Sequence, residues 1–597
     1  MSKKPITCLF LSIIWQLSPL SAQDVERLLK GSPISLSGSI AVNQIGYAAS
    51  GIESRRDPYS FFASGGLTFG FYEWSFPFSF TYSNQQGTLF NRPVIQPFNQ
   101  FTLSPRYRNY SAYVGYNSMT FSPYTLSGHI FVGGGAEASF QKVKAAAMYG
   151  RLRKAVSPTA ERPEDVVYQR MGYGAQVAYN HNGSQVDFSF FRGKDDERSV
   201  SLENVDTVFV TPEENLAFGL SASHRFFNKW SLSASYALSA LTTDTRAGRE
   251  SLQSSRFYNG LGGFFTANQS TAFYDAVKLA TSYLGTGYTV GFGYERVDPG
   301  YTSHGAYYFV NDLENITVNG SKVLAGGKVN VSASGGVQRD NLDNQKISTL
   351  KRFVGDASVG YTPSTHLNLS VAYSNFQTFT NIRSQFEDIN QLTPFENLDT
   401  LDFTQISESL NTTVNYVLGT SEVKRQNIGF NASIQQSRDE QANLEQPTGS
   451  TFYLFSGNYS LGLVPQKMNV SVAANYNKND APGMVTETIG PSLSASKSLM
   501  ENKANVSASL SWNQSRTNGI SNGSVTSFRI GGRYLLKERH NLNLNVTTVN
   551  RSFPENEATV NTDYTELTAT LGYSYSFNRS NLFSKERKAA TEKPNTP

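Results

Sequence analysis

Residues Thr565 to Phe577 read T-E-L-T-A-T-L-G-Y-S-Y-S-F. The odd positions of this stretch are mostly apolar, and its even positions are polar or small. A period of two places alternate side chains on opposite faces of a strand. One face of this strand therefore meets an apolar medium and the other meets water. The apolar positions are Leu567, Ala569, Leu571, Tyr573, Tyr575 and Phe577.

The same alternation recurs along the whole chain. One such segment would fit an amphipathic strand of a soluble sandwich, but a run of them with Ser and Asn on the second face favours a barrel. We therefore expect an all-β fold, a single antiparallel up-and-down transmembrane β-barrel whose apolar face meets lipid. Clear examples are residues 230–238, 367–373, 428–434, 468–476, 506–512 and 542–546.

The end of the opening stretch resembles the C-terminal assembly signal of bacterial outer-membrane barrels. In that signal a polar residue and Gly precede two alternating aromatics; here they are Thr570, Gly572, Tyr575 and Phe577. The resemblance implies the outer membrane of a Gram-negative bacterium, its lipid as the surroundings, and the barrel-assembly machinery as a partner during biogenesis. The stretch Met119–His129 is similar to one in outer-membrane barrels of Bacteroidota.

The first residues have the features of a processing segment. Lys3 and Lys4 precede a mostly apolar run from Ile6 to Trp15, and the small residue Ala22 stands before Gln23. This pattern predicts a secretory signal peptide, with a short amphipathic helix as the alternative. The expected segments are a signal peptide (1–22), a short periplasmic N-terminal segment (23–33), the transmembrane barrel (34–577) and a basic periplasmic tail (578–597).

The connections between alternating segments are alternately short and long. Short ones such as His181-Asn-Gly and Asn228-Lys contain Asn and Gly, which supply the backbone angles of hairpin turns. The number of long ones predicts about 26 strands, an even number. Short turns face the periplasm and long loops the outside in such barrels, so both termini should be periplasmic. The expected N-terminal segment is too short for the folded plug domain of TonB-dependent transporters.

Composition excludes several other classes. Charged residues make up 16% of the chain, below the roughly 25% of soluble domains. Mean hydropathy is −0.36, as expected when every second strand residue faces a wet lumen. The net charge of +4 is small for this length, so we expect no nucleic-acid partner. The one cysteine, Cys8, lies in the expected signal peptide, which leaves the mature chain without disulfides or thiolate metal sites.

Taking the apolar face of each strand as outward assigns a lumen face. Both signs of charge occur there, so no one-signed ring indicates ion selectivity, and a wet, neutral wall is the alternative interpretation. Arg529 and Arg533 lie on the same face of one strand and form a local positive spot. The charges expected to face the lumen are Lys144, Asp187, Lys278, Glu295, Lys328, Asp356, Arg529 and Arg533.

Three connections stand out. Residues 193–214 are acidic, and residues 378–406 combine acidic residues with Phe. Loops this long are usually functional, and the second could constrict the pore, bind divalent cations or dock a partner, with surface solvation as the alternative. In Met119–His129 the alternation breaks, and Phe121, Tyr124 and Leu126 predict an ordered loop tucked over or into the barrel mouth. The candidate plug or partner residues of the second loop are Phe386, Glu387, Asp388, Phe395, Glu396, Asp399 and Asp402.

Catalytic signals are weak. None of the six histidines pairs with another at metal-ligand spacing, so we expect no metal. His129 and His304 fall in expected outer loops, and Ser303 adjoins His304, but neighbours on an extended chain point apart and do not form a dyad. No P-loop or Gly-x-Gly-x-x-Gly motif opens a helix, so we expect no enzyme and no cofactor.

The leading functional hypothesis is therefore a pore or translocation conduit for polar solutes or a larger cargo. About 26 strands enclose more than side chains fill, since 16 to 18 already leave a channel. Long loops or a separate protein would have to plug it. Barrels of this size resemble lipopolysaccharide-insertion and protein-export barrels, which work with partners. The alternatives are a scaffold barrel of a surface machine, with a periplasmic or surface protein as partner, and a hydrolase at the barrel rim.

Overall fold

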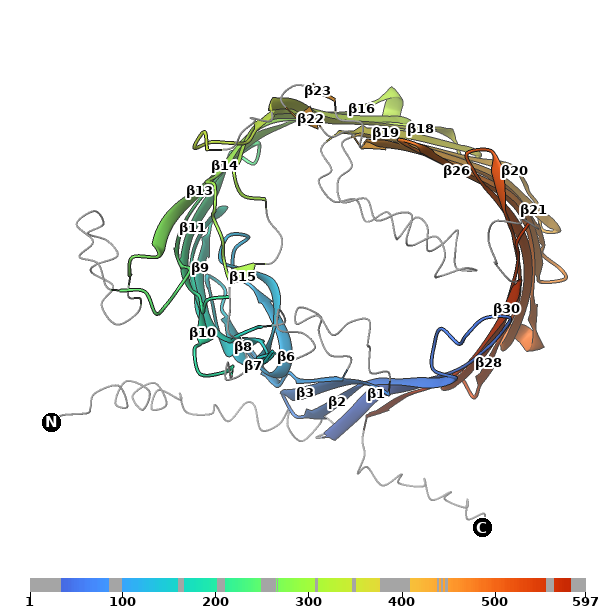
Figure 1. The fold of residues 1–597 in the computed structure, drawn as a ribbon, viewed down its shortest axis with the longest axis horizontal. Coiled ribbons are helices and arrows are strands. Elements are labelled where there is room, and N and C mark those ends of the chain that lie inside the picture. Colours follow the sequence, from blue (N-terminus) through green and yellow to red (C-terminus); the bar gives the residue numbers. More distant parts are fainter. Residues whose placement is uncertain are drawn as a thin grey trace, which may run out of the picture.

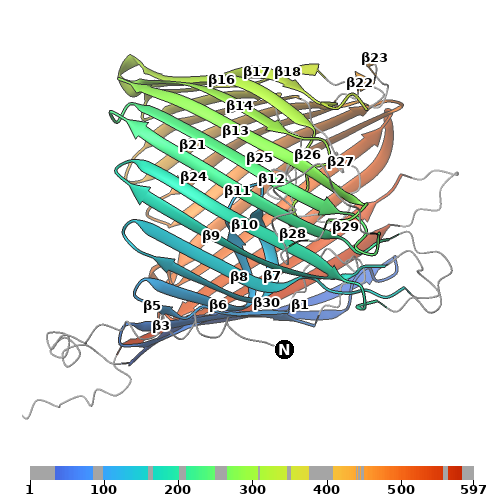
Figure 2. The same ribbon diagram turned by 90° about the vertical axis from the view of Figure 1, so that its left-hand side faces the viewer.

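The computed structural model describes residues 34–84, 99–158, 166–200, 210–248, 265, 267–306, 310–345, 351–375, 408–437, 440–441, 444–445, 449–554 and 563–580. In these residues the chain forms one 28-stranded sheet that curls into a ring, together with a separate pair of short strands (Figure 1). Figure 2 shows the strands inclined to the barrel axis. None of the described helices is long and apolar enough to cross a membrane.

Twenty-six antiparallel strands make the closed wall, which confirms the predicted fold class and strand number. Two facts reconcile this number with the larger sheet. The short strands β4 and β5 both pair between β3 and β6 and act as one interrupted strand, and β15 is a two-residue strand that pairs parallel to β7.

The first half of the wall contains the strands β1 (Ile34–Ser50), β2 (Tyr59–Phe71), β3 (Trp74–Ser83), β4 (Gln100–Leu103), β5 (Arg106–Tyr107), β6 (Tyr110–Thr120), β7 (Leu126–Ser139), β8 (Val143–Arg153), β9 (Gln169–His181), β10 (Ser184–Asp196), β11 (Glu214–Phe226), β12 (Trp230–Thr242), β13 (Thr271–Gly285) and β14 (Tyr288–Val297). Inside the ring lies β15 (Gly305–Ala306).

The second half contains β16 (Leu313–Leu324), β17 (Val329–Arg339), β18 (Lys351–Ser364), β19 (Leu367–Ser374), β20 (Glu408–Thr420), β21 (Lys424–Ser437), β24 (Ser450–Leu463), β25 (Met468–Ala481), β26 (Met484–Leu499), β27 (Ala504–Thr517), β28 (Ile520–Leu536), β29 (His540–Ser552) and β30 (Tyr564–Ser580). The separate pair is β22 (Glu440–Gln441) and β23 (Leu444–Glu445), and two 3-10 turns are η2 (Ala325–Gly327) and η3 (Met500–Asn502).

The wall follows from the period-two pattern. Large apolar side chains such as Leu571, Leu544 and Phe528 stand exposed on its outer face. Ser and Asn alternate with them and face the lumen. A closed barrel with an apolar outer band satisfies every backbone group without water, which is the requirement for crossing lipid.

The ring closes between the first and last strands. β30 pairs antiparallel with β1 from Ser35 opposite Ser580 to Ser50 opposite Thr565, and it pairs with β29 on its other side. β1 begins at Ile34, and β30 runs past Phe577 to Ser580. Closure leaves no free strand edge among the described strands of the wall.

Turn chemistry fixes the register of the hairpins. Between β9 and β10, Asn182 and Gly183 have φ of 47° and 79°. Positive φ at both central residues suits the turns that match strand twist, and Asn-Gly is the preferred pair for them. His181 then faces Ser184 across the hairpin.

Candidate site in the barrel lumen

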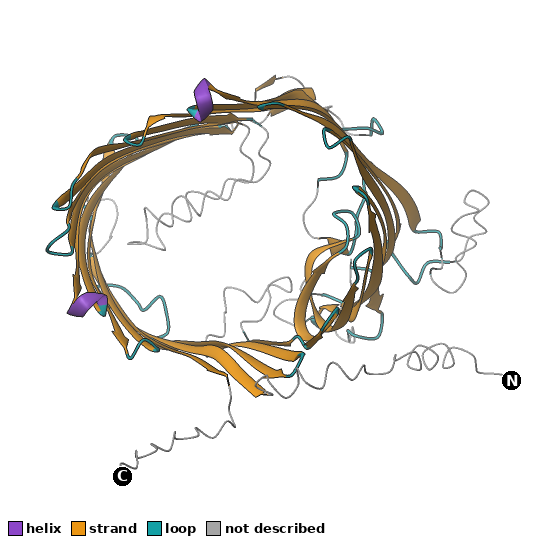
Figure 3. Cartoon of the chain, turned by 180° about the vertical axis from the view of Figure 1, so that it is seen from behind, coloured by secondary structure: helices purple, strands orange, loops and turns teal. Residues whose placement is uncertain are grey.

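The tip of the β6–β7 hairpin leaves the wall and folds into the barrel. β7 pairs with β8 only from Val132 to Ser139, so the preceding residues of β7 are free of β8. They pair instead with the end of β6 and with β15, which belongs to the β14–β16 connection. Both segments lie within the ring in Figures 1 and 3. We call residues 117–131 and 298–306 together the lumen plug.

Two apolar clusters seat the lumen plug on the inner wall. Around Phe121, one cluster joins the plug to β8 and β10; its buried members are Met119, Phe121, Leu126, Phe131, Ala146, Met148, Leu152 and Phe191. The other joins Tyr124 and Tyr301 of the plug to Ala237, Ala276 and Val297 of β12, β13 and β14. The predicted ordered loop around Phe121, Tyr124 and Leu126 is thus confirmed: all three side chains are buried.

Buried hydrogen bonds join the two halves of the plug and tie it to the wall. The Tyr301 hydroxyl donates to the Tyr124 carbonyl at 2.9 Å, and the Ser303 hydroxyl donates to the Thr125 carbonyl. Asn215 on β11 is fully buried; its Nδ2 donates to the Thr302 carbonyl at 3.1 Å, and its Oδ1 accepts from the His304 amide at 3.1 Å. The side-chain amide of Asn215 therefore binds two backbone groups of the plug, the Thr302 carbonyl and the His304 N–H.

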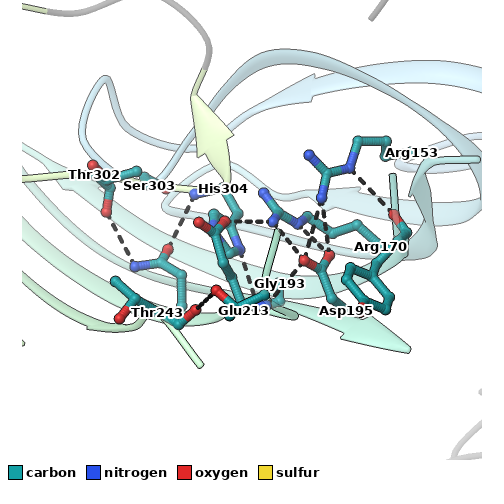
Figure 4. A network of polar contacts seen from close by, with 12 residues as sticks. Arg153, Arg170, Gly193, Asp195, Glu213, Thr243, Thr302, Ser303 and His304 are labelled. Carbon is teal, nitrogen blue, oxygen red and sulfur yellow. Dashed lines mark hydrogen bonds and ion pairs between the residues drawn. The ribbon is translucent and has the colours of Figure 1, made fainter. Parts of the chain in front are cut away.

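A buried ionic cluster lies beside these bonds (Figure 4). Arg170 donates through Nε and Nη2 to the two Asp195 oxygens at 2.7 and 2.9 Å, and its Nη2 also reaches Glu213 Oε2 at 2.7 Å. Arg153 lies 3.2 Å from Asp195 Oδ2. His304 of the plug places Nε2 3.2 Å from Glu213 Oε2. We call Arg153, Arg170, Asp195, Glu213 and His304 the charged latch.

Strand register brings the latch together. A β-bulge at Leu152 shifts the β8–β9 pairing, so that Arg153 lies opposite Arg170 and both face the lumen. Arg170 is also opposite Asp195 on β10. Two adjacent guanidinium groups need a shared anion, and a buried carboxylate with bidentate bonds supplies it.

Glu213 and His304 lie just outside the strands β11 and β15. The electrostatics of the latch favour an ionised Glu213 and a neutral His304. Burial opposes the charged form of Glu213, but a protonated His304 and Arg170 outweigh it and lower the pKa of Glu213 to about 2. When the His304 ring is neutral, the ion pair with Arg170 at 2.7 Å still favours the carboxylate. Burial, with Arg170 nearby, lowers the pKa of His304 below its ordinary value. Its Nδ1 lies 3.3 Å from the Gly193 carbonyl, whereas Nε2 is within ion-pair distance of Glu213 but not aligned for a hydrogen bond.

A cavity of about 580 Å³ opens on the inner wall next to the plug. Strands β12, β13, β14, β16, β17 and β18 line it, and its polar residues include Lys278, Glu295, Asn315, Asn319, Ser334 and Asp356. Lys278 Nζ donates to Glu295 Oε2 at 3.1 Å. The Tyr124 hydroxyl of the plug donates to the other oxygen, Glu295 Oε1, at 2.5 Å. The cavity and the plug therefore share one carboxylate.

The charges expected to face the lumen fall into three groups. Lys278, Glu295 and Asp356 come together around the cavity. The side chains of Lys144, Asp187, Arg529 and Arg533 have the strand phase opposite to exposed apolar neighbours such as Val143, Phe188 and Phe528. Lys328 lies at the end of η2, in the β16–β17 turn, and not on a strand. Arg533 Nε donates to Asn541 Oδ1 at 2.8 Å, and Arg529 Nε donates to Thr547 at 3.3 Å.

The acidic connection 193–214 is split between the two faces of the wall. Asp195 and Glu213 enter the latch, whereas Glu214 pairs with Arg192 at 2.5 Å and with Lys194 at 3.2 Å. Arg192, Lys194 and Glu214 lie at strand positions that face outward, whereas Asp195 faces the lumen. The other candidate loop, with Phe386, Glu387, Asp388, Phe395, Glu396, Asp399 and Asp402, lies outside the described residues, as do residues 1–33 and 581–597.

The prediction of outer loops for both histidines is wrong for His129. It lies on β7 and is buried, because this part of the strand turns inward with the plug. His304 does lie in a connection, but the connection folds into the lumen and buries it. Ser303 binds the Thr125 carbonyl and not the His304 ring. Among the described residues, no group of three His, Cys, Asp or Glu side chains could hold a metal ion.

Sequence reasoning missed Arg153, Arg170 and Asn215. Arg170 and Asn215 occupy ordinary lumen-facing strand positions. The period-two alternation therefore did not distinguish them from the other polar residues of the inner wall. Arg153 faces inward only because of the bulge at Leu152. Arg170 and Asn215 share one feature that the sequence does show: each is a polar residue at a lumen-facing strand position close to a long connection.

No protein-family model and no curated protein matches the chain. Among solved structures, the translocation pore of the P pilus usher PapC has a TM-score of 0.37 at 11% identity, covering 91% of this chain and 99% of that one. The FrpB iron transporter from Neisseria meningitidis gives 0.34 at 9%, covering 94% and 83%. OccD3 from Pseudomonas aeruginosa gives 0.29 at 8%, covering 92% and 94%. Likenesses this low do not assign a family.

Proposed function

We propose that the chain is an outer-membrane conduit for polar solutes or a larger cargo, constricted by its lumen plug. The observation that carries the proposal is the plug itself: two connections fold into a barrel of 26 strands and are held there by two apolar clusters, buried hydrogen bonds and the charged latch. Barrels with fewer strands already hold an aqueous channel, so a built-in constriction has a space to regulate.

The membrane assignment rests on the outer face. Exposed Leu, Ile, Val and aromatic side chains alternate with small polar residues on strand after strand, which suits lipid outside and water inside. We infer a Gram-negative outer membrane, with the short turns and both termini in the periplasm and the latch toward the cell exterior. The assembly machinery would be a partner during biogenesis, and the resemblance around Met119–His129 points to Bacteroidota.

Single-channel conductance of the purified, folded protein in a planar bilayer tests the proposal. We expect low conductance from the intact protein and a large, stable increase when a short Gly-Ser linker replaces residues 299–306. A matched deletion within residues 378–406 serves as the comparison, since that loop was the other candidate plug. An increase only in the comparison would move the constriction to that loop, and silence in both folded variants would contradict a conduit.

A further inference from the structure

The cavity beside the plug has the chemistry of a ligand site that the conduit alone does not require. Its volume of about 580 Å³ lies within the roughly 300–1,000 Å³ of small-molecule pockets. Most of its polar lining is uncharged: Ser and Thr hydroxyls and Asn carboxamides, each able to donate and accept. Three charged groups, Lys278, Glu295 and Asp356, stand among them.

The charges of the cavity argue against an ionic ligand. Lys278 is already paired with Glu295 at 3.1 Å, and the Ser334 hydroxyl donates to Asp356. One cation against two carboxylates disfavours phosphate, sulfate or carboxylate ligands, and a carboxylate already bonded to Lys278 is a poor site for a cation. Among the residues that line the cavity, none is an arginine or a histidine.

Asn315 supplies independent evidence for a missing partner. The residue is 7% exposed, it lines the cavity, and its Oδ1 is buried without a hydrogen-bond partner. A buried unpartnered carbonyl oxygen is costly. A half-turn of the terminal torsion exchanges Oδ1 with Nδ2, so the carboxamide can offer a ligand either an acceptor or a donor.

We propose that this cavity binds a neutral, hydroxyl-rich ligand, a segment of an uncharged oligosaccharide. Vicinal hydroxyls donate and accept side by side, which matches carboxylates that accept, an ammonium that donates and carboxamides that do both. A site built from such groups rejects ligands without hydroxyls, because its own polar groups would be left unpaired.

The same ligand would act on the plug, and this part rests on the proposed conduit. Glu295 Oε1 accepts the Tyr124 hydroxyl and Oε2 accepts Lys278. A sugar hydroxyl that donates to Glu295 competes with Tyr124 for the same oxygen. Occupancy of the cavity therefore loosens one of the bonds that hold the plug, and the sugar promotes its own passage.

Binding is tested with the folded, full-length protein in detergent on an array of neutral oligosaccharides, anionic glycans and peptides, followed by calorimetry with the best-bound member. We expect neutral oligosaccharides to bind, with affinity at least tenfold lower in Asn315→Leu and in Asp356→Ala. The matched control, Asn475→Ala, removes a carboxamide on β25, outside the cavity, and should bind as the parent does. Failure of every neutral oligosaccharide, preference for anionic glycans or peptides, or full affinity in both cavity variants overturns the proposal.

Coupling to the plug is read from conductance with and without the bound oligosaccharide. We expect the sugar to raise the open fraction of the parent protein, and Tyr124→Phe to be more open at rest and to lose most of the response. An unchanged response in Tyr124→Phe overturns the coupling. If the protein binds sugar but never conducts, the ligand site stands and the proposed conduit is contradicted. If it conducts but binds no sugar, the conduit stands and the ligand site is contradicted.

Discussion

Asp195 is the residue on which the latch depends. It is fully buried, accepts two hydrogen bonds from Arg170 and one from the Glu213 amide, and lies within ion-pair distance of Arg153. Removing one partner of a buried ion pair leaves uncompensated charge. Asp195→Ala would leave Arg153 and Arg170 facing each other without their shared anion.

We therefore expect Asp195→Ala to lower the free energy of unfolding by about 3–5 kcal/mol, measured by urea titration of the folded protein in detergent. Asp187→Ala is the matched control, since Asp187 lies on the same strand and face, outside the charged latch, and accepts a hydrogen bond from Gln185 Nε2 at 2.7 Å. Its effect should stay within about 0.5 kcal/mol. Equal losses in the two variants would contradict the central place of Asp195.

His304 gives the plug a pH dependence with a definite sign. Burial and Arg170 hold its pKa below the ordinary 6.5, so the seated plug keeps the ring neutral, while a released plug would take up a proton below that pH. The seated state is therefore favoured above pH 6.5 and loses stability as the pH falls. Glu213 stays ionised over this range because its pKa is about 2.

Amide hydrogen exchange of residues 301–306, corrected for intrinsic rates, should accelerate between pH 7.5 and 5.5. His304→Gln keeps a polar side chain but cannot titrate, and it should remove the pH step. Protection that rises on acidification would show that the Glu213 pair stabilises a charged ring, the opposite sign.

At the residue scale, sequence reasoning located charge but not burial. The acidic character of residues 193–214 was evident, yet the split of Asp195 to the lumen and Glu214 to the outer face depends on strand phase at the end of β10 and start of β11. Burial of Asp195 depends further on Arg170, which lies far away in the chain and becomes a neighbour only through the β9–β10 register.

At the scale of elements, the inward bend of β7 depends on a glycine. A Cβ on Gly133 would lie 2.2 Å from the Tyr149 carbonyl oxygen and 2.5 Å from the Gly150 Cα, both backbone atoms of β8. A Cβ on the adjacent Gly134 would meet only the Tyr113 carbonyl at 3.5 Å, an ordinary contact. An added Cβ at Gly133 would therefore clash with the β8 backbone just where the hairpin begins to leave the wall.

Gly133→Ala should therefore cost about 1–3 kcal/mol of stability, the usual range for overpacking, and should raise resting conductance because the plug loses its support. Gly134→Ala, one residue away, should change neither by a measurable amount. Urea unfolding and bilayer recordings on the same preparations provide both readouts. Identical behaviour of the two variants would mean that the bend does not depend on close approach at Gly133.

Elements of the wall were predictable because each strand carries its own period. The plug was predictable only in part. Phe121, Tyr124 and Leu126 break the alternation and so predicted an ordered segment. The strand β15 has only two residues, too few to show a period-two pattern. β15 pairs in parallel with β7 and brings Gly305 opposite Leu126. These residues lie far apart in the sequence, and the pairing depends on how the plug packs inside the barrel.

At the scale of the whole molecule, the strand count followed from alternating connection lengths, since a closed up-and-down barrel repeats one hairpin unit. Closure itself depends on β30. Its outward Phe577 and Tyr575 lie opposite Gly38 and Ile40 of β1, and the inward Gly572 leaves room for Asn43 and Asn543, whose side-chain oxygens would lie 2.5 and 1.8 Å from an added Cβ.

A chain that ends before Gly572 loses the part of the β30–β1 ladder from Ser35 to Asn43 and, with it, the pairing of β29 from His540 to Asn543. Both strands would then present unpaired backbone groups to lipid, which cost several kcal/mol each. We expect this truncation to abolish the heat-modifiable folded form in outer-membrane fractions and Phe577→Ala to reduce it strongly. Ser576→Ala, on the lumen face of the same strand, should assemble normally. Parental levels of the truncated chain would show that the barrel closes through another strand.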